Sequence, residues 1–499
     1  MSGGQDVQTP VERFYAFERR EGLMHREVGG CRYWHLVRFS AYLRLVLPLL
    51  VTISRAHPDR QRRNDSPLAR FRTLCGVLRD MLFFNPSLSC RKCDILFALE
   101  PRKTVMPDGR RISLLLDFFI PRMRASIGVL ELRPTEGLLA AFRLGFRAFR
   151  ICGFPIRRRV FRVSSRFHRI GKEIEEESEW VASRLSHAFG VEVSGKRLRK
   201  LIERAVLDRQ VALPVFRSWL RRLDVRCLVV GVHYSRYNLI LTEAAHDLGL
   251  EVVELQHGLV IPEHVAYNLP EPGSPYAPDV LLSWGRFWER GLRNFPRKEV
   301  IPVGYPYLEH FLGVYPPRCQ AHERKTVLFV SQGTVGQGLS RLAVELHGLL
   351  PEADILYKLH PSESRTWRTL YPELVGSGVE VVENTARNIY SCFGDADAMV
   401  GSYSTALIEG FMWGLRAYVL RSLYGSGIMS GFAGSGQVVY VNSAADLANR
   451  LREDFLHKTV ARPLGEGYWV SGAARRIAAW LDCRCGIIST EAKATCPEN

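Results

Sequence analysis

The chain lacks any uninterrupted apolar run of the roughly 18 to 20 residues that a membrane-spanning helix requires. The nearest run, residues 45–53, is too short and follows Arg44 directly. The first residues carry scattered charge and contain no apolar segment of the kind found in a secretory leader. We therefore expect a cytoplasmic protein.

Cysteines are too scattered for a disulfide framework. The chain has 11 of them, an odd number, and most stand alone. Such usage is typical of a reducing compartment. Cys90 and Cys93 form a C-x-x-C pair, but a structural zinc site needs two more ligands at matching spacing and none follows nearby. The sequence therefore predicts no metal site.

Acidic residues are outnumbered. The chain has 68 Lys and Arg against 51 Asp and Glu, a net charge of +17 over 499 residues. This excess favours contact with an anion, such as nucleic acid, a lipid surface or a phosphorylated substrate. The apolar share of 46 % and charged share of 24 % are close to the globular average. The length predicts about three compact units, or two large ones with extensions.

Residues 1–90 are rich in Arg and aromatic residues and predict a basic helical N-terminal extension. Within it, the helix-compatible apolar run 33–53 contains Arg38 and Arg44. A helix with Trp, Tyr and flanking Arg suits the headgroup region of an anionic leaflet. We expect this arm to place the protein peripherally at the inner face of the plasma membrane, with an ordinary packing helix as the alternative.

The rest of the chain alternates apolar strands with helical stretches twice, over 91–310 and 311–485, with a hinge at 306–325 and a tail at 486–499. This alternation predicts an α/β fold of two Rossmann-like domains, whose ligands bind in a cleft at the carboxyl ends of the strands. The expected strands are 94–99, 112–120, 227–234, 252–256 and 279–285 in the first domain, and 326–333, 354–361, 379–384, 398–402 and 417–420 in the second.

A strongly basic stretch at 156–172 is followed at once by an acidic block at 173–179. Adjacent blocks of opposite sign indicate a solvated or self-paired helix. Aromatic residues interleaved for base stacking are missing. We therefore expect no nucleic-acid partner.

Two strand ends in the second domain carry groups suited to phosphate. Lys358 and His360 stand at the end of strand 354–361, where a cation and an imidazole could bind an anion; the alternative is a His that satisfies a neighbouring carbonyl. After strand 398–402, the hydroxyls of Ser402, Ser404 and Thr405 stand at a helix start, where free N–H groups and the positive helix pole favour anions. Ordinary helix capping is the alternative there.

Three further positions are candidates. Glu409, inside the same helix, could accept hydrogen bonds from ribose hydroxyls or simply face solvent. Gln332 and Gly333 begin a glycine loop that fits no P-loop pattern. In the first domain, His257 follows a strand and could deprotonate an acceptor hydroxyl, with Glu263 close behind as a second catalytic candidate; a positioning or core His is the alternative.

The segments QHG (256–258), KLHP (358–361) and DADAMVGSYSTALIEG (395–410) resemble, in order and spacing, two-domain GT-B transferases of bacterial surface polymers. The relatives are the capsule, polysialic acid and Kdo transferases with an HP and a Ser/Thr motif, and the CDP-glycerol glycerophosphotransferases. Residues 97–120 are a fainter match to the amino-terminal domain of capsule-type proteins.

This resemblance implies inverting, metal-independent transfer from a nucleotide-activated donor to a surface or capsular polysaccharide or a lipid-linked glycan, with no cofactor besides the nucleotide-sugar co-substrate. His360 and the cap of Ser402, Ser404 and Thr405 would hold the donor phosphates, Glu409 the ribose, and His257 would be a candidate base or a substrate ligand. Fixed donors and a helix pole can replace a divalent ion in stabilising a leaving phosphate. Asp395 and Asp397 form a D-x-D, but it precedes its strand and we expect it to end a helix.

Two departures from the family bear on the donor. His257 is followed by LVIPEH and not by the Thr-Pro of the glycerophosphotransferases, which favours a sugar donor. The D/E-D/E-G motif of the sialyltransferases is not evident. The alternatives are a CDP-glycerol-type glycerophosphotransferase, a sugar-nucleotide epimerase, and a non-catalytic polysaccharide-assembly protein.

Overall fold

A computed structural model of the chain separates into two compact units. Unit 1 comprises the described residues of Met1–Leu50, Asn64–Pro306 and Tyr468–Asn499, and unit 2 those of Tyr307–Gly467. Described are residues 9–50, 82–88, 92–99, 103–105, 111–132, 147–151, 154–317, 324–333, 335–383, 387–421, 429–432, 436–457 and 467–487.

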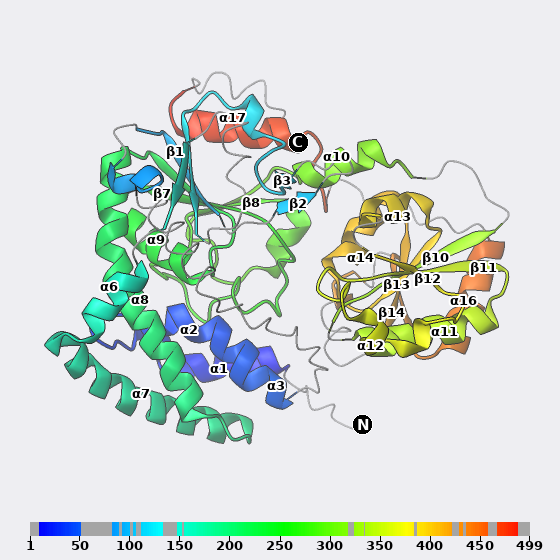
Figure 1. The fold of residues 1–499 in the computed structure, drawn as a ribbon, viewed down its shortest axis with the longest axis horizontal. Helices are drawn as coiled ribbons and strands as arrows, with labels where there is room; N and C mark the ends of the chain where they lie inside the picture. The colour runs from blue at the N-terminus through cyan, green and yellow to red at the C-terminus, as the bar shows by residue number, and fades with distance from the viewer. Residues whose placement is uncertain are drawn as a thin grey trace, which may run out of the picture. The chain divides into compact units, whose positions relative to one another are not determined.

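Unit 1 is built on a parallel sheet of seven strands in the order β5-β4-β1-β6-β7-β8-β9 (Figure 1). The chain starts in the middle of the sheet, moves to one edge and then crosses to the other side of β1, as in doubly wound folds. The topological switch point therefore lies between β1 and β6. The strands are β1 Ile95–Leu99, β4 Ile127–Glu131, β5 Arg147–Arg150, β6 Cys227–Val230, β7 Glu251–Leu255, β8 Val280–Ser283 and β9 Glu299–Pro302.

The expected strand at 112–120 is wrong. Only β3 (Arg111–Ser113), paired with β2 (Lys103–Val105), is extended there, and the chain then turns into a short 3-10 helix at Ile120–Arg122. Leu116, Phe119 and Ile120 are all buried in the core of unit 1. Their i, i+3, i+4 spacing is that of a helical turn, so an apolar run that suggested a strand buries its side chains as a turn instead.

Helices complete unit 1, and the longest are α7 and α8. Each of these two begins at a serine, Ser164 or Ser194, whose side chain accepts a hydrogen bond from a backbone N–H of the first turn. The helices are α1 Pro10–Arg20, α2 Tyr33–Ala41, α3 Leu47–Leu50, α6 Phe154–Arg162, α7 Ser165–Phe189, α8 Gly195–Leu223, α9 Arg236–His246 and α17 Ala473–Arg484.

The expectation that residues 1–90 form an extension with a membrane-facing helix is not supported by the described part, residues 9–50 and 82–88. Tyr33 and Trp34 at the start of α2 are fully buried within unit 1. Arg38, one turn on, is 3 % exposed and forms a buried ion pair with Glu18 of α1. Burial of the aromatic side chains inside the protein removes the groups that were expected to meet lipid.

Helix α17 returns to unit 1 after the whole of unit 2, although the sequence placed residues up to 485 in the second domain (Figure 1). Its apolar face carries Ile477 and Leu481, which pack in one cluster with Ile95 and Phe97 of β1. Burial of this face, worth about 1.5–3 kcal/mol for each large apolar side chain, is the physical reason for the return. Residues 488–499, most of the expected tail, lie outside the described residues.

Unit 2 has a parallel sheet of six strands in the order β12-β11-β10-β13-β14-β15. The five strands expected in this domain are confirmed, and β15 is an addition. The switch point lies between β10 and β13, where the strand order reverses. The strands are β10 Lys325–Val330, β11 Ala353–Lys358, β12 Glu380–Val382, β13 Ala398–Gly401, β14 Arg416–Leu420 and β15 Val438–Val441.

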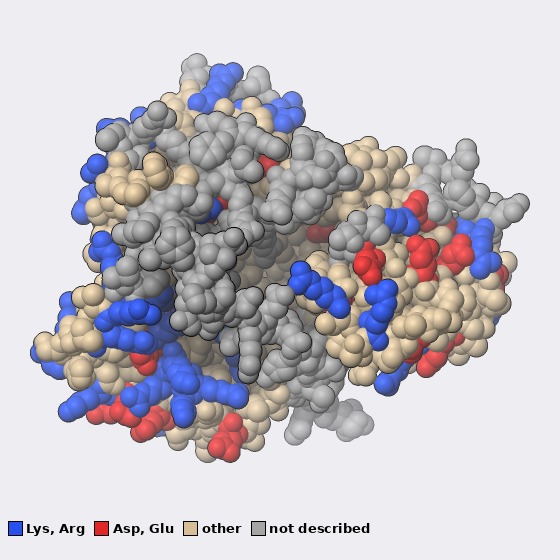
Figure 2. Space-filling model, viewed as in Figure 1, with Lys and Arg blue, Asp and Glu red and all other residues tan. Residues whose placement is uncertain are grey.

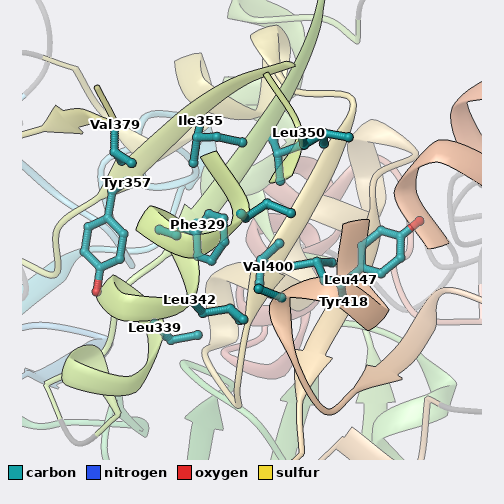
Figure 3. Packing of buried hydrophobic residues seen from close by; sticks show 14 of the residues in the cluster. Phe329, Leu339, Leu342, Leu350, Ile355, Tyr357, Val379, Val400, Tyr418 and Leu447 are labelled. Carbon is teal, nitrogen blue, oxygen red and sulfur yellow. The ribbon is translucent and has the colours of Figure 1, made fainter. Parts of the chain in front are cut away.

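Alternate residues of these strands form the core of unit 2 (Figure 3). Phe329 of β10, Tyr357 of β11 and Val400 of β13 face Leu342 of α11 and Leu447 of α16. This packing fixes the sheet and therefore the positions at which its strands end. The helices are α10 Pro306–Val314, α11 Gly336–Leu349, α12 Trp367–Leu370, α13 Ile389–Asp395, α14 Thr405–Gly410 and α16 Ala444–Leu456.

The expected hinge at 306–325 is in part a helix. Helix α10 occupies its first half, and Phe311 stacks on Tyr390 of α13 with 4.7 Å between ring centroids. That half therefore belongs to unit 2, while residues 318–323 lie outside the described residues. Among the described helices, none combines the length and the apolar character that crossing a membrane demands.

Candidate functional site

The polar strand ends of unit 2 meet at one edge of its sheet. Strand β10 lies between β11 and β13, and all three run parallel. Adjacent strands are about 4.8 Å apart, so the segments that follow them lie side by side. Within two residues of the strand ends, these segments carry Gln332, His360 and Ser402. The structure thus brings three sequence-predicted positions to the carboxyl edge, next to the switch point where ligands bind in this class of fold.

Two buried polar atoms at this edge have no hydrogen-bond partner in the described part of the chain. They are Oε1 of Gln332 and Oγ of Ser402. Ser402 is 2 % exposed. A buried polar atom without a partner costs about 1–3 kcal/mol. The two atoms follow β10 and β13, the strands on either side of the switch point, and a ligand at this position would supply the missing partners.

Ser404 and Thr405 start α14 as expected. The Ser404 hydroxyl accepts a hydrogen bond of 3.3 Å from the N–H of Ala406, which is the ordinary capping role that the sequence left open. Thr405 is partly exposed. The Ser404 oxygen thus accepts from the helix start while its own O–H remains a donor, and Ser402 and Thr405 are the other two hydroxyls of this turn that could donate to a ligand.

His360 is exposed and its ring is held in one orientation. Its Nδ1 lies 2.7 Å from Oγ of Ser362 and accepts from the Ser362 N–H at 3.2 Å. Because Nδ1 accepts, the neutral ring carries its proton on Nε2, which then points away from Ser362 as a donor. In the same loop, the Glu363 carboxylate accepts from the backbone N–H of His360 at 2.9 Å and from the Tyr371 hydroxyl at 2.9 Å. The loop thus presents a fixed N–H donor.

Lys358 faces inward. It is 3 % exposed, and its Nζ donates a hydrogen bond of 2.6 Å to the carbonyl of Arg387. Burial lowers the pKa of this ammonium group to about 8. Lys358 is thus a structural cation beneath the edge, and His360 is the exposed member of the pair that the sequence predicted.

Glu409 is buried, which excludes the alternative of a solvent-facing side chain, and its expected role toward a ribose stays a prediction. Its Oε2 accepts a hydrogen bond of 2.7 Å from the Tyr390 hydroxyl. Burial raises the pKa of the Glu409 carboxyl to about 7. A ribose hydroxyl would have to reach Oε1, since Oε2 is already engaged.

One glycine of the loop after β10, Gly336, is required by packing. A Cβ at Gly336 would lie 2.0 Å from the hydroxyl of Tyr371, so no side chain fits at the start of α11. The Gly336 carbonyl also accepts from the Tyr357 hydroxyl at 3.0 Å. Gly333, three residues earlier, lies in the turn itself and is partly exposed. The loop is fixed by two tyrosines of the core of unit 2.

The D-x-D pair is structural, as expected. Asp395 ends α13 and pairs with Arg387, and Asp397 binds Lys325 at 2.9 Å and the N–H of Thr326 at 2.9 Å. Within the described ranges, no group of three or more His, Cys, Asp or Glu side chains could hold a metal ion. Cys90 of the C-x-x-C pair lies outside those ranges.

In unit 1, His257 follows β7 and lies in a buried network. Its Nε2 is 3.1 Å from the Tyr234 hydroxyl, and its Nδ1 is 3.1 Å from the Tyr267 hydroxyl and 3.5 Å from Oε1 of Glu254. Tyr267 donates to the same Glu254 oxygen at 3.0 Å. The His257 side chain is only 2 % exposed. Tyr234 is partly exposed, in contrast to His257.

Glu254 is the anion of this network. Its other oxygen lies 2.7 Å from Nδ1 of His233, whose Nε2 is 3.0 Å from the carbonyl of Ala266. Burial opposes ionisation of Glu254, but the imidazoles of His233 and His257 outweigh it and hold the pKa at about 2. A carboxylate that faces Nδ1 of an imidazole orients the ring and stabilises its protonated form.

Sequence reasoning missed Tyr234, His233 and Glu254. A signal was present, because the apolar run 227–234 ends in His-Tyr at a strand end, just as the next strand ends in Gln-His. Glu254 gave no signal, since a carboxylate inside an apolar strand is recognised only when its partners are known. Glu263 lies outside this network in the described structure: it is partly exposed, and burial raises its pKa.

A cavity of about 40 Å³ lies beside this network. Its lining includes Arg38 and Phe39 of α2, together with His233 and Tyr234. The N-terminal helices thus contribute directly to the neighbourhood of the candidate base.

No family model and no curated protein matches the chain. Among solved structures, the chain is similar to a glycotransferase of kitacinnamycin, with 12 % identity, 79 % of this chain and 99 % of that chain covered, and a TM-score of 0.47. A UDP-GlcNAc 2-epimerase from Methanocaldococcus jannaschii matches with 10 % identity, 78 % and 99 % coverage, and a TM-score of 0.48. The spinosyn rhamnosyltransferase SpnG complexed with thymidine diphosphate matches with 13 % identity, 79 % and 96 % coverage, and a TM-score of 0.39.

Proposed function

We propose that the protein is a glycosyltransferase that uses a nucleotide-activated sugar donor without a metal ion. The observation that carries the proposal is the pair of unpartnered buried atoms, Oε1 of Gln332 and Oγ of Ser402, at the switch point of unit 2. Ligands of doubly wound sheets bind at this place.

In this proposal the donor phosphates lie between the segments that follow β10, β11 and β13. Nε2–H of His360, the hydroxyls of Ser402 and Thr405, and the Gly333 backbone would donate to the phosphate oxygens. Such fixed donors stabilise the charge that develops on the leaving nucleotide as its bond to the sugar breaks. Glu409 would accept from the ribose through Oε1.

The acceptor hydroxyl would be activated by unit 1. As the acceptor oxygen forms its bond to the sugar C1, it would pass its proton to the Tyr234 oxygen, while Tyr234 passes its own proton to Nε2 of His257. The Glu254 carboxylate would stabilise the imidazolium. Attack on the face opposite the leaving phosphate inverts the anomeric centre. His257 then acts through Tyr234, in keeping with its 2 % exposed side chain.

The acceptor class rests on the resemblance of three segments to enzymes of bacterial surface polymers. We propose a surface or capsular polysaccharide or a lipid-linked glycan as acceptor. The cleft between two facing domains, which the sequence resemblance to GT-B transferases implies, stays a prediction.

The first test is nucleotide binding. A panel of nucleoside mono- and diphosphates and sugar nucleotides should include one that raises the melting temperature, because a ligand that binds only the folded state stabilises it. With His360→Ala or with Ser402→Ala, at least tenfold more ligand should be needed to raise the melting temperature by the same amount. The matched control is His457→Ala, an exposed histidine after α16 in the same unit. Equal shifts in the wild type and the His360→Ala variant would reject the phosphate site.

The second test separates the classes of activity. Nucleotide release in the presence of a lipid-linked glycan acceptor supports transfer. Interconversion of the free sugar nucleotide identifies an epimerase, and glycan binding without turnover identifies an assembly protein. Transfer of glycerol phosphate from CDP-glycerol identifies a glycerophosphotransferase.

A further inference from the structure

The segment 156–172 covers α6 and the start of α7 and is entirely basic in its charged residues. The sequence indicated that this segment and the acidic block 173–179 form a solvated or a self-paired helix. The structure speaks against self-pairing for three of the glutamates, because each binds a group outside the basic segment. The partners are the Gly29 N–H for Glu173 at 2.8 Å, Arg199 for Glu175, and Arg26 for Glu177.

Two of the seven basic residues do have acidic partners. Arg158 pairs with buried Asp208 at 2.9 Å, and Arg162 pairs with Glu203 at 2.7 Å. The others are exposed, and none of them has an ion pair within the described chain. They are Arg157, Arg159, Arg166, Arg169 and Lys172.

Apolar side chains stand among these cations. Val160 is 66 % exposed and Val163 is 81 % exposed, the latter in the turn that joins α6 to α7. Phe161 and Phe167 pack on each other with 5.9 Å between ring centroids and are partly exposed. We name Arg157, Arg159, Val160, Val163, Arg166 and Arg169 the basic surface. Figure 2 shows Lys and Arg side chains gathered over the part of unit 1 where α6, α7 and α8 lie.

We propose that the basic surface docks on an anionic phospholipid surface. Arginines near such a surface are attracted by its negative potential, and exposed valines between them can enter the boundary between headgroups and acyl chains. A polynucleotide would satisfy the charge but would leave the two valines in water, because base stacking uses aromatic faces and the two phenylalanines here pack on each other.

This docking surface is distinct from the one expected at the N-terminal arm, of which Tyr33 and Trp34 are buried in the protein and residues 51–81 lie outside the described residues. It does not depend on the proposed transferase activity, because vesicle binding requires neither donor nor acceptor. A failure of either proposal leaves the other intact.

The experiment is sedimentation of the full chain with vesicles. Phosphatidylcholine vesicles that contain phosphatidylglycerol should bind the protein, and vesicles of phosphatidylcholine alone should bind it weakly. Each arginine near an anionic surface raises the partition coefficient onto vesicles about fivefold. The variant Arg166→Gln/Arg169→Gln should therefore lower this coefficient by roughly tenfold or more. Binding should fall as salt shortens the Debye length.

The matched control removes the same charge elsewhere. Arg221→Gln/Arg222→Gln changes two exposed arginines at the far end of α8 and should leave partition within about twofold of the wild type. Val160→Ser/Val163→Ser keeps every charge and should lower binding most clearly at high salt, where electrostatic attraction is screened. The Arg166→Gln/Arg169→Gln and Val160→Ser/Val163→Ser variants should keep the wild-type melting temperature, because the altered side chains are exposed.

Three results overturn the proposal. One is equal binding to neutral and anionic vesicles. Another is an equal loss in the basic-surface variant and the control variant, which would mean that only net charge matters. The third is binding to a duplex oligonucleotide that is tighter than binding to anionic vesicles and unaffected by the valine substitutions, which would identify a nucleic-acid surface.

Discussion

The Tyr390 hydroxyl donates a hydrogen bond of 2.7 Å to Oε2 of Glu409, and this bond joins α13 to α14 inside unit 2. The carboxyl is buried, and burial raises its pKa to about 7. Since α14 follows the switch-point loop that carries Ser402, the protonation of Glu409 bears on the stability of the candidate donor site.

We predict that Glu409 destabilises the folded chain as pH rises. The folded pKa of about 7 exceeds the ordinary value of about 4.3, so the folded state binds more protons between these values. The stabilisation that comes from keeping this carboxyl protonated in the folded state is complete below the unfolded pKa. It is lost as pH rises through 7, and the free energy of unfolding then falls by roughly 3 kcal/mol. Glu409→Gln should therefore gain melting temperature over wild type at pH 8 but not at pH 4.5. A difference that stays constant with pH would contradict this prediction.

The ion pair of Arg38 and Glu18 should be costly to break. Both side chains are almost wholly buried, with Nη2 to Oε2 at 2.7 Å, and Glu18 also accepts from the Trp34 indole at 2.7 Å. Arg38→Met leaves a buried carboxylate with too few partners and should lower the free energy of unfolding by about 3–5 kcal/mol. The double variant Arg38→Met/Glu18→Gln should recover part of the loss. Denaturant titration checks both, and an Arg38→Met cost below about 1 kcal/mol would refute the buried pair.

Tyr234→Phe should reduce turnover by about 10²-fold or more, because it interrupts the proposed proton path to His257. Nucleotide-induced stabilisation of the chain should persist, since that site lies in unit 2. Tyr237→Phe serves as the matched control, because Tyr237 lies in the first turn of α9 and its hydroxyl has no hydrogen bond in the described chain. Equal turnover of wild type and Tyr234→Phe would exclude the relay.

The variant Glu254→Gln tests the same proton path through the pH dependence of kcat. The wild-type carboxyl has a pKa of about 2, so it stays ionised over any practical range, and the pH profile of kcat should report the imidazole. With a neutral amide in place of the carboxylate, the His257 imidazolium loses its counter-ion. The limb of the kcat profile that reports deprotonation of His257 should then shift to lower pH. An unshifted limb would show that Glu254 does not support the base.

Chelation should leave activity unchanged. Asp395 and Asp397 are engaged with Arg387 and Lys325, and the proposed phosphate donors are side chains and backbone. Turnover measured with and without EDTA should agree within error. Strict dependence on Mg²⁺ would contradict the metal-independent mechanism.

Much of the fold could be predicted because strand and helix periods are local. The five strands expected in unit 2, each a run of β-branched and apolar residues, appear in the structure. The segment 112–120 failed because its consecutive apolar residues fit a buried turn as well as a strand. The return of α17 to unit 1 depends on a contact between Ile477 and the β1 strand, which sequence periodicity cannot specify.

For the candidate site, too, the sequence and the tertiary structure determined different features. The sequence by itself determined which chemical groups stand at strand ends: an imidazole at His360, a hydroxyl at Ser402 and an imidazole at His257. Only the tertiary structure decided that Gln332 and Ser402 flank one switch point, that Glu409 faces Tyr390, and that Glu254 lies under His257. Local sequence sets the strand ends, whereas partners come from strand order and burial, which depend on contacts far apart along the chain.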